Sequence, residues 1–179
     1  MIQKRLSLLA ILVLMLSACA TTTDTMEPRA GATPEGDIAA IVTAANEGEI
    51  QQGQAASTRA TNADVRAFAQ MMVADHTAAL NTARDTFNRA GINASDNTIA
   101  NTLRASSQTT VTNLNTYSGA DFDRAYMRTQ VDLHAWLLNV LDVSLIPSAV
   151  TPELRTLLQT QRASVAAHLD QARGILSRL

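Results

Sequence analysis

The sequence predicts an all-α protein, a four-helix bundle with one long connection, and three observations lead to this prediction. Apolar residues recur at spacings of three, four and seven over four long segments, which is typical of amphipathic helices. No segment alternates apolar and polar residues over a useful length, so no sheet is expected. The connections within the first and the last pair of helices are short, whereas the connection between the second and third helices is long.

The first pair of helices is expected at 37–59 and 62–90. Gly48 and Gly53 lower the helix propensity of the first, so close packing against a neighbour is expected to compensate. Asn62 is the predicted N-cap of the second helix, and Gly91 its C-terminal stop. The inward face of the first helix is predicted to contain Ile38, Ile41, Val42, Ala45, Glu49, Gln52 and Ala56. That of the second contains Val65, Phe68, Ala69, Met72, His76, Ala79, Leu80, Ala83 and Phe87.

The second pair is expected at 119–145 and from 152 to the C-terminus. Thr151, Pro152 and Glu153 supply a cap, a proline in the first helical position and an acid in the first turn. His134 lies on one flank of the inward face of the third helix, and His168 lies within that of the fourth. The polar segment 92–118 allows only a short helix. A single long crossover of this kind is the connection pattern of ferritin-like folds.

The N-terminal residues carry the signals of an exported lipoprotein. Lys4 and Arg5 precede an apolar run, LSLLAILVLML, that is too short to span a bilayer permanently. The following LSAC resembles a bacterial lipobox, which implies cleavage before Cys19 and lipid attachment to it; an ordinary secretory peptide is the alternative. The predicted domains are a signal peptide at 1–18, a flexible Thr-, Pro- and Gly-rich tether at 19–36 and the bundle at 37–179.

The lipid on Cys19 would anchor the protein to a membrane without spanning it. Ala20 follows, where an Asp tends to retain Gram-negative lipoproteins in the inner membrane, so the expected location is the outer membrane facing the periplasm. Cys19 is the only cysteine, which excludes an intramolecular disulfide. With a net charge of −2 and 3% aromatic residues, nucleic acid is not an expected partner. No nucleophile elbow or phosphate-binding glycine loop is present, so no hydrolase activity is predicted.

Four polar residues on inward faces point to a metal. The chain has three histidines, His76, His134 and His168, each on a different helix, and Glu49 is the one charged residue on its stripe. An isolated carboxylate in a core is costly unless it is paired or bound to a cation. At a helical rise of about 1.5 Å per residue, the four fall within a band about 8 Å deep. Imidazole and carboxylate together suit a single zinc, iron or manganese ion, and Met72 beside His76 would suit copper.

Other roles for these residues remain open at this stage. Each histidine could be a hydrogen-bonded core residue, with Glu49 paired to His76 or His168 and no metal. Asp75 is expected to be a solvated residue or an orienting partner of His76, and Asp123 to favour the start of its helix electrostatically. The predicted function is that of a lipid-anchored envelope bundle without catalysis, a binding or stress-related module in which the core has room for a single metal ion. The alternatives are a metal-dependent redox enzyme and a metal-free structural or partner-binding bundle.

The segments FAQMMVADH (68–76) and FDRAYMRTQVDLH (122–134) resemble the exported bacterial family labelled domain of unknown function 4142. This resemblance implies a ferritin-like bundle and export, but no established activity. The residues that match are Glu49, Phe68, Met72, Asp75, His76, Phe122, Asp123, Tyr126, His134 and His168.

Di-iron ferritin-like proteins carry a Glu three residues before a His on two helices. Here Val73, Val131 and Val165 occupy the positions three before the three histidines. The four-carboxylate site is therefore absent, and ferroxidase chemistry is not expected.

Overall fold

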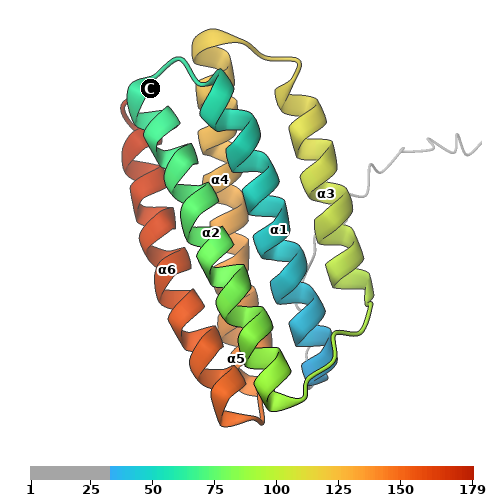
Figure 1. The fold of residues 1–179 in the computed structure, drawn as a ribbon. Coiled ribbons are helices and arrows are strands. Elements are labelled where there is room, and N and C mark those ends of the chain that lie inside the picture. Colours follow the sequence, from blue (N-terminus) through green and yellow to red (C-terminus); the bar gives the residue numbers. More distant parts are fainter. Residues whose placement is uncertain (1–32) are drawn as a thin grey trace, which may run out of the picture.

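The computed structural model describes residues 33–179, which form a bundle of long helices (Figure 1). In chain order the elements are α1 (Glu35–Arg59), α2 (Ala63–Ala90), α3 (Thr98–Leu114), α4 (Gly119–Val140), the π-helical η1 (Leu141–Leu145), α5 (Ile146–Ser148) and α6 (Pro152–Leu176). The predicted all-α fold is confirmed, and no strand occurs among the described residues. The predicted signal peptide, Cys19 and most of the tether lie outside them.

Within residues 33–179, no helix combines the length and the apolar character that crossing a membrane requires.

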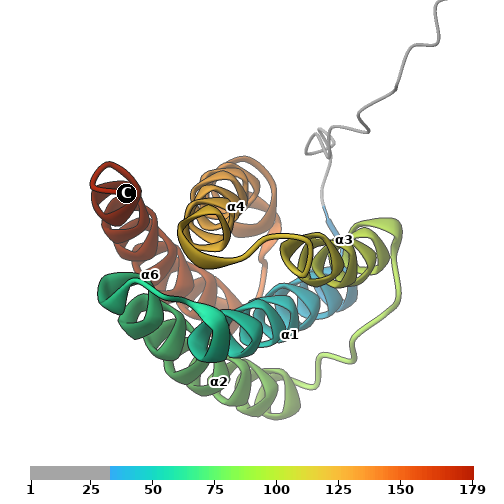
Figure 2. The ribbon, with the colours of Figure 1, turned by 90° about the horizontal axis from the view of Figure 1, so that it is seen from above.

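Four helices, α1, α2, α4 and α6, surround the common core. Seen from above, α6, α2 and α1 lie in an arc and α4 faces them from the other side (Figure 2). Each short connection joins antiparallel helices: α1 to α2, and α4 through α5 to α6 (Figure 1). The pairing expected from the connection lengths is thus confirmed.

The long connection differs from the prediction, because it contains a full helix of 17 residues, α3, which packs on the outer side of α1 (Figure 2). Small side chains make this contact: the Ser107 hydroxyl donates to the Gly48 carbonyl at 3.1 Å. A Cβ on Gly48 would lie 3.1 Å from the Ser107 Cβ, so glycine permits the close approach. The weak apolar signal of α3 reflects its few buried residues, which are Ala100, Leu103, Ser107 and Leu114.

Gly53 makes the corresponding contact between α1 and α2. A Cβ there would lie 2.9 Å from Val73 Cγ2 and 3.0 Å from the Ala69 carbonyl oxygen. The expectation that close packing compensates for both helical glycines is confirmed.

Two of the predicted helix ends are confirmed and one differs. Asn62 Oδ1 accepts hydrogen bonds from the backbone N–H groups of Asp64 and Val65, and Gly91 has the left-handed φ of 66°. Thr151 precedes α6, but its side chain does not cap it; the hydroxyl donates to Glu35 Oε2 at 2.7 Å. This contact ties the start of α1 to the start of α6, and α1 begins at Glu35, two residues before the predicted boundary.

Asp123 has a different role from the predicted one. Its side chain is buried, and the carboxylate accepts hydrogen bonds from the Thr61 backbone N–H at 3.0 Å, the Thr61 hydroxyl at 2.6 Å and the Asn62 backbone N–H at 2.8 Å. It therefore holds the α1–α2 connection against α4, rather than acting mainly on the start of its own helix.

Two apolar clusters fill the bundle, one toward each end. The first is built around Ile38, Phe87 and Leu154, and the second around Phe68, Tyr126 and Ile175. Along each core helix, the residues between the two clusters are polar and buried: Glu49 and Gln52 on α1, His76 on α2, Gln130 and His134 on α4, and His168 on α6. A polar layer thus divides the core at mid-height.

Replacing Asp123 by Ala is expected to lower the free energy of unfolding by about 2–4 kcal/mol, because three donors lose a charged acceptor. Replacing Asp121, which is exposed in the first turn of the same helix, is expected to cost at most about 1 kcal/mol. Urea denaturation of both variants measures the difference. Equal losses would mean that the predicted helix-start effect, and not the connection, accounts for Asp123.

Candidate metal centre

Three histidine side chains from three helices meet in the polar layer. His76, His134 and His168 replace apolar residues at inward positions of α2, α4 and α6, and at most 6% of each residue is exposed. Their ring centroids are 5.4–6.0 Å apart, and one nitrogen from each ring lies within 4.8 Å of the other two. Nitrogens bound to one ion at about 2.1 Å lie at most about 4.2 Å apart, so small side-chain rotations bring all three to a shared ion.

One nitrogen of each ring, called the outer nitrogen below, is hydrogen-bonded to an oxygen acceptor; the other is called the inner nitrogen. His76 Nδ1 lies 2.9 Å from Asn46 Oδ1, and Asn46 Nδ2 donates to the Val42 carbonyl, so the amide oxygen accepts from the ring. His134 Nδ1 donates to the Gln130 carbonyl at 2.8 Å, and His168 Nε2 donates to Asp75 Oδ2 at 3.0 Å. Each outer nitrogen therefore carries the ring hydrogen.

The inner nitrogen of each ring carries no hydrogen, and its lone pair is free. His76 Nε2, His134 Nε2 and His168 Nδ1 are buried and have no hydrogen-bond partner among the described residues. A ring whose outer N–H binds a carboxylate or carbonyl, with the other nitrogen free, is the usual form of a metal-binding histidine. One nitrogen of each ring belongs to the converging group, and one nitrogen of each ring is a buried lone pair without a hydrogen-bond partner.

Burial keeps the three rings uncharged at neutral pH. Burial, together with repulsion from the other two rings when they are protonated, lowers the pKa of His76 to about 3. Burial also lowers the pKa of His134 to about 4. Burial also lowers the pKa of His168, although the hydrogen bond to Asp75 opposes the effect. Protons therefore do not compete with a metal ion for the lone pairs at pH 7.

Glu49 lies beside this group but outside it. Its Oε1 is 3.6 Å from His134 Nδ1, the outer nitrogen of that ring, and neither carboxylate oxygen has a hydrogen-bond partner. The residue is fully buried, and this burial raises the pKa of Glu49 to about 7. Of the four residues predicted from the sequence, the structure brings the histidines together and places Glu49 behind His134.

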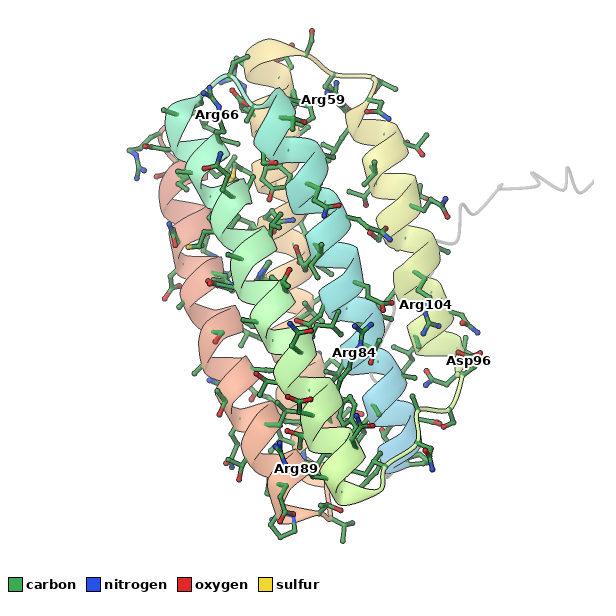
Figure 3. All side chains as sticks on the ribbon, in the orientation of Figure 1. Arg59, Arg66, Arg84, Arg89, Asp96 and Arg104 are labelled. Carbon is green, nitrogen blue, oxygen red and sulfur yellow. The ribbon has the colours of Figure 1, made fainter. Side chains whose placement is uncertain are left out.

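The remaining charged side chains contrast with Glu49. Arg84 pairs with Glu47 at 2.9 Å, and Arg104 with Asp96 at 3.3 Å, all on the outside of the bundle (Figure 3). Glu49 is the only carboxylate among residues 33–179 whose two oxygens are both buried and without a hydrogen bond.

Sequence reasoning missed two partners of the histidines. Asp75 is half-exposed and accepts from His168 on α6, not from its neighbour His76. Asn46 was not singled out, although it lies four residues after Val42 on the buried face of α1. That spacing was the available signal for Asn46, whereas nothing in the sequence indicates which residue of α2 faces His168.

In protein stripped of metal by a chelator, Glu49→Gln is expected to increase the free energy of unfolding at pH 8 by about 1–3 kcal/mol. The raised pKa of Glu49 means that its protonated form stabilises the fold below about pH 4.5, and that this contribution is lost as pH rises through about 7. The gain should therefore vanish at pH 4. Urea denaturation at several pH values measures it, with the exposed Glu47→Gln as control. A Glu49→Gln variant no more stable than the parent at pH 8 would contradict the assignment.

Among known proteins, the chain matches a family model but no individual protein. No curated protein and no solved structure matches the chain. The family model described as "Domain of unknown function (DUF4142)" matches residues 20–175, which include the whole polar layer. The resemblance seen in FAQMMVADH and FDRAYMRTQVDLH is thereby confirmed, and the chain belongs to the DUF4142 family.

Proposed function

We propose that His76, His134 and His168 bind one divalent metal ion, and that the protein is a metal-binding module of the cell envelope. The observation that carries this proposal is the convergence of three buried rings, each of which has one nitrogen without a hydrogen-bond partner. A buried polar atom without a partner costs free energy, and a cation bound by all three offsets this cost at once.

The chemistry of the donors narrows the choice of ion. Three neutral imidazoles are intermediate in softness and favour Zn²⁺, Cu²⁺ or Fe²⁺ over Mn²⁺ and Mg²⁺, which prefer oxygen. Asp75 and Glu49 supply negative charge close to two of the rings without belonging to the converging group. Three histidine ligands with an open fourth position are the pattern of zinc sites that bind a further molecule.

The geometry weighs against a metal-free structural core. Such a core would pair Glu49 with His76 or His168, but the nearest ring atom is His134 Nδ1 at 3.6 Å, beyond hydrogen-bond distance. His134 Nδ1 already donates to Gln130. A metal-dependent redox enzyme remains the second candidate, because the open fourth position is what such an enzyme would need.

Location in the envelope is part of the proposal and depends on the N-terminal sequence. Lys4, Arg5, the apolar run and LSAC stand in the order of a lipoprotein signal, and Ala20 follows the cysteine. The lipid on Cys19 would hold the bundle at a membrane surface, which we propose is the periplasmic face of the outer membrane.

The protein is expected to bind one Zn²⁺ or Cu²⁺ per chain and to melt at a higher temperature with the metal, since an ion that binds only the folded state stabilises it. Each of His76→Ala, His134→Ala and His168→Ala should abolish both effects. Asp75→Asn should keep the fold and weaken metal affinity about 10- to 100-fold, because His168 loses its charged acceptor. Mass spectrometry for metal content and thermal denaturation provide the two readouts.

The matched control is Asp85→Asn, an exposed carboxylate on the same helix as Asp75. Its metal affinity should equal that of the parent. A parent protein that gains neither metal nor thermal stability would overturn the metal proposal. Equal affinity in Asp75→Asn and Asp85→Asn would remove Asp75 from the site.

Cys19→Ser is expected to abolish lipid attachment and to release the protein from the membrane fraction. Metabolic labelling with a fatty-acid analogue, followed by fractionation of the producing cells, measures both. The parent should carry the label and sediment with outer membranes. An unlabelled parent in the soluble periplasmic fraction would favour the ordinary secretory peptide instead.

A further inference from the structure

A pocket of about 370 Å³ leads to the histidines from the side of the bundle where α2 faces α6. Its walls are mainly apolar and include Ile41, Val42, Leu137, Leu141, Leu145 and Leu157. Thr160 and Ser164, both exposed on α6, lie at its rim. Pockets that bind small organic molecules usually begin at about 300 Å³ and are mostly apolar, so this one falls at the small end of that range.

The inner end of the pocket is polar. His76 and His168 line it, and His134, the third ring of the group, lies behind them. Gln161 also lines the pocket, and its amide Nε2 is a buried donor without a hydrogen-bond partner. Gln161 precedes His168 by seven residues, about 10 Å along α6, so the free N–H donor lies at a different depth of the pocket from an ion held by the rings.

The π-helical segment η1 shapes the apolar wall. The Ile146 N–H bonds to the Leu141 carbonyl, five residues back, so this turn is wider than an α-helical turn. Leu141 and Leu145 are both buried and both line the pocket. Single π-helical turns within α-helices cost regular hydrogen bonding and occur frequently at functional sites.

The only positive charge in the pocket would come from the ion. No Lys or Arg is among the described residues that line it, and its one charged residue, Asp75, accepts from His168. An ion with three neutral ligands keeps its positive charge and an open position. An anionic oxygen complements that position, while the apolar walls complement a hydrocarbon body.

We propose that the pocket binds a small carboxylate with an apolar body, its head on the metal and its body along Leu141 and Leu145. This inference rests on the proposed metal site. A cavity of about 150 Å³ holds benzene, so 370 Å³ accommodates a body of about eight to ten heavy atoms. Without a cationic side chain in the pocket, the carboxylate binds only when the ion is present.

The test measures binding of octanoate by calorimetry to the full-length chain carrying Cys19→Ser, in zinc-loaded and chelator-treated forms. Octanol supplies the same body without the charge, and acetate the same head without the body. Metal content is determined first for every sample. The zinc-loaded protein is expected to bind octanoate at least tenfold more tightly than the zinc-free protein, and more tightly than it binds octanol or acetate.

Two variants locate the ligand. Ala79→Phe places a ring in the pocket and is expected to reduce octanoate affinity at least tenfold with metal content unchanged, whereas Ala105→Phe, on the exposed face of α3, should change neither.

The outcomes separate the two proposals. Stoichiometric zinc with octanoate binding that equals octanol binding, or that Ala79→Phe leaves intact, overturns the carboxylate site and leaves the metal site standing. Octanoate binding of equal strength with and without zinc overturns the metal anchor of the head. A parent that takes up no metal overturns the metal site and, with it, this inference.

Discussion

Three buried ring nitrogens without hydrogen-bond partners are the constraint on which the rest of the structure depends. Each such nitrogen destabilises the folded state unless a partner binds it, and three of them lie in the same layer of the core. The outer nitrogens are meanwhile fixed by Asn46, by the Gln130 carbonyl and by Asp75. The two apolar clusters above and below this layer supply the burial that holds it in place.

The four core helices contribute different side chains to this polar layer. α2, α4 and α6 provide one ring each, whereas α1 provides no ring but carries Asn46 and Glu49. Gly53 lets α1 approach α2 closely, which brings Asn46 within reach of His76. The buried carboxylate of Glu49 is then poorly stabilised on its own, so a cation on the other side of His134 would offset its charge as well.

The helical periodicity predicts the four core helices and the inward positions of His76 and His168, but it places His134 on a flank of its helix, whereas that residue is fully buried. It underestimated the length of α3, because this helix buries only four residues and one of them, Ser107, is polar. It also could not pair Asp75 with His168, since the register of α2 against α6 is set by packing and not by spacing within either helix. Leu141 and Leu145 line the pocket from a wider turn just before Pro147, a residue that indicates a break in the helix but not the form of the turn.

The position of the rings along the chain bears on how the protein opens. Asp75 and His168 are 93 residues apart, and an ion between the rings would act as a cross-link that closes this long loop. α3 lies between the linked segments but contributes no ring, and it buries only Ala100, Leu103, Ser107 and Leu114. α3 is also the outer helix, so in the metal-loaded protein we expect its backbone amides to exchange with solvent faster than those of α2, α4 and α6.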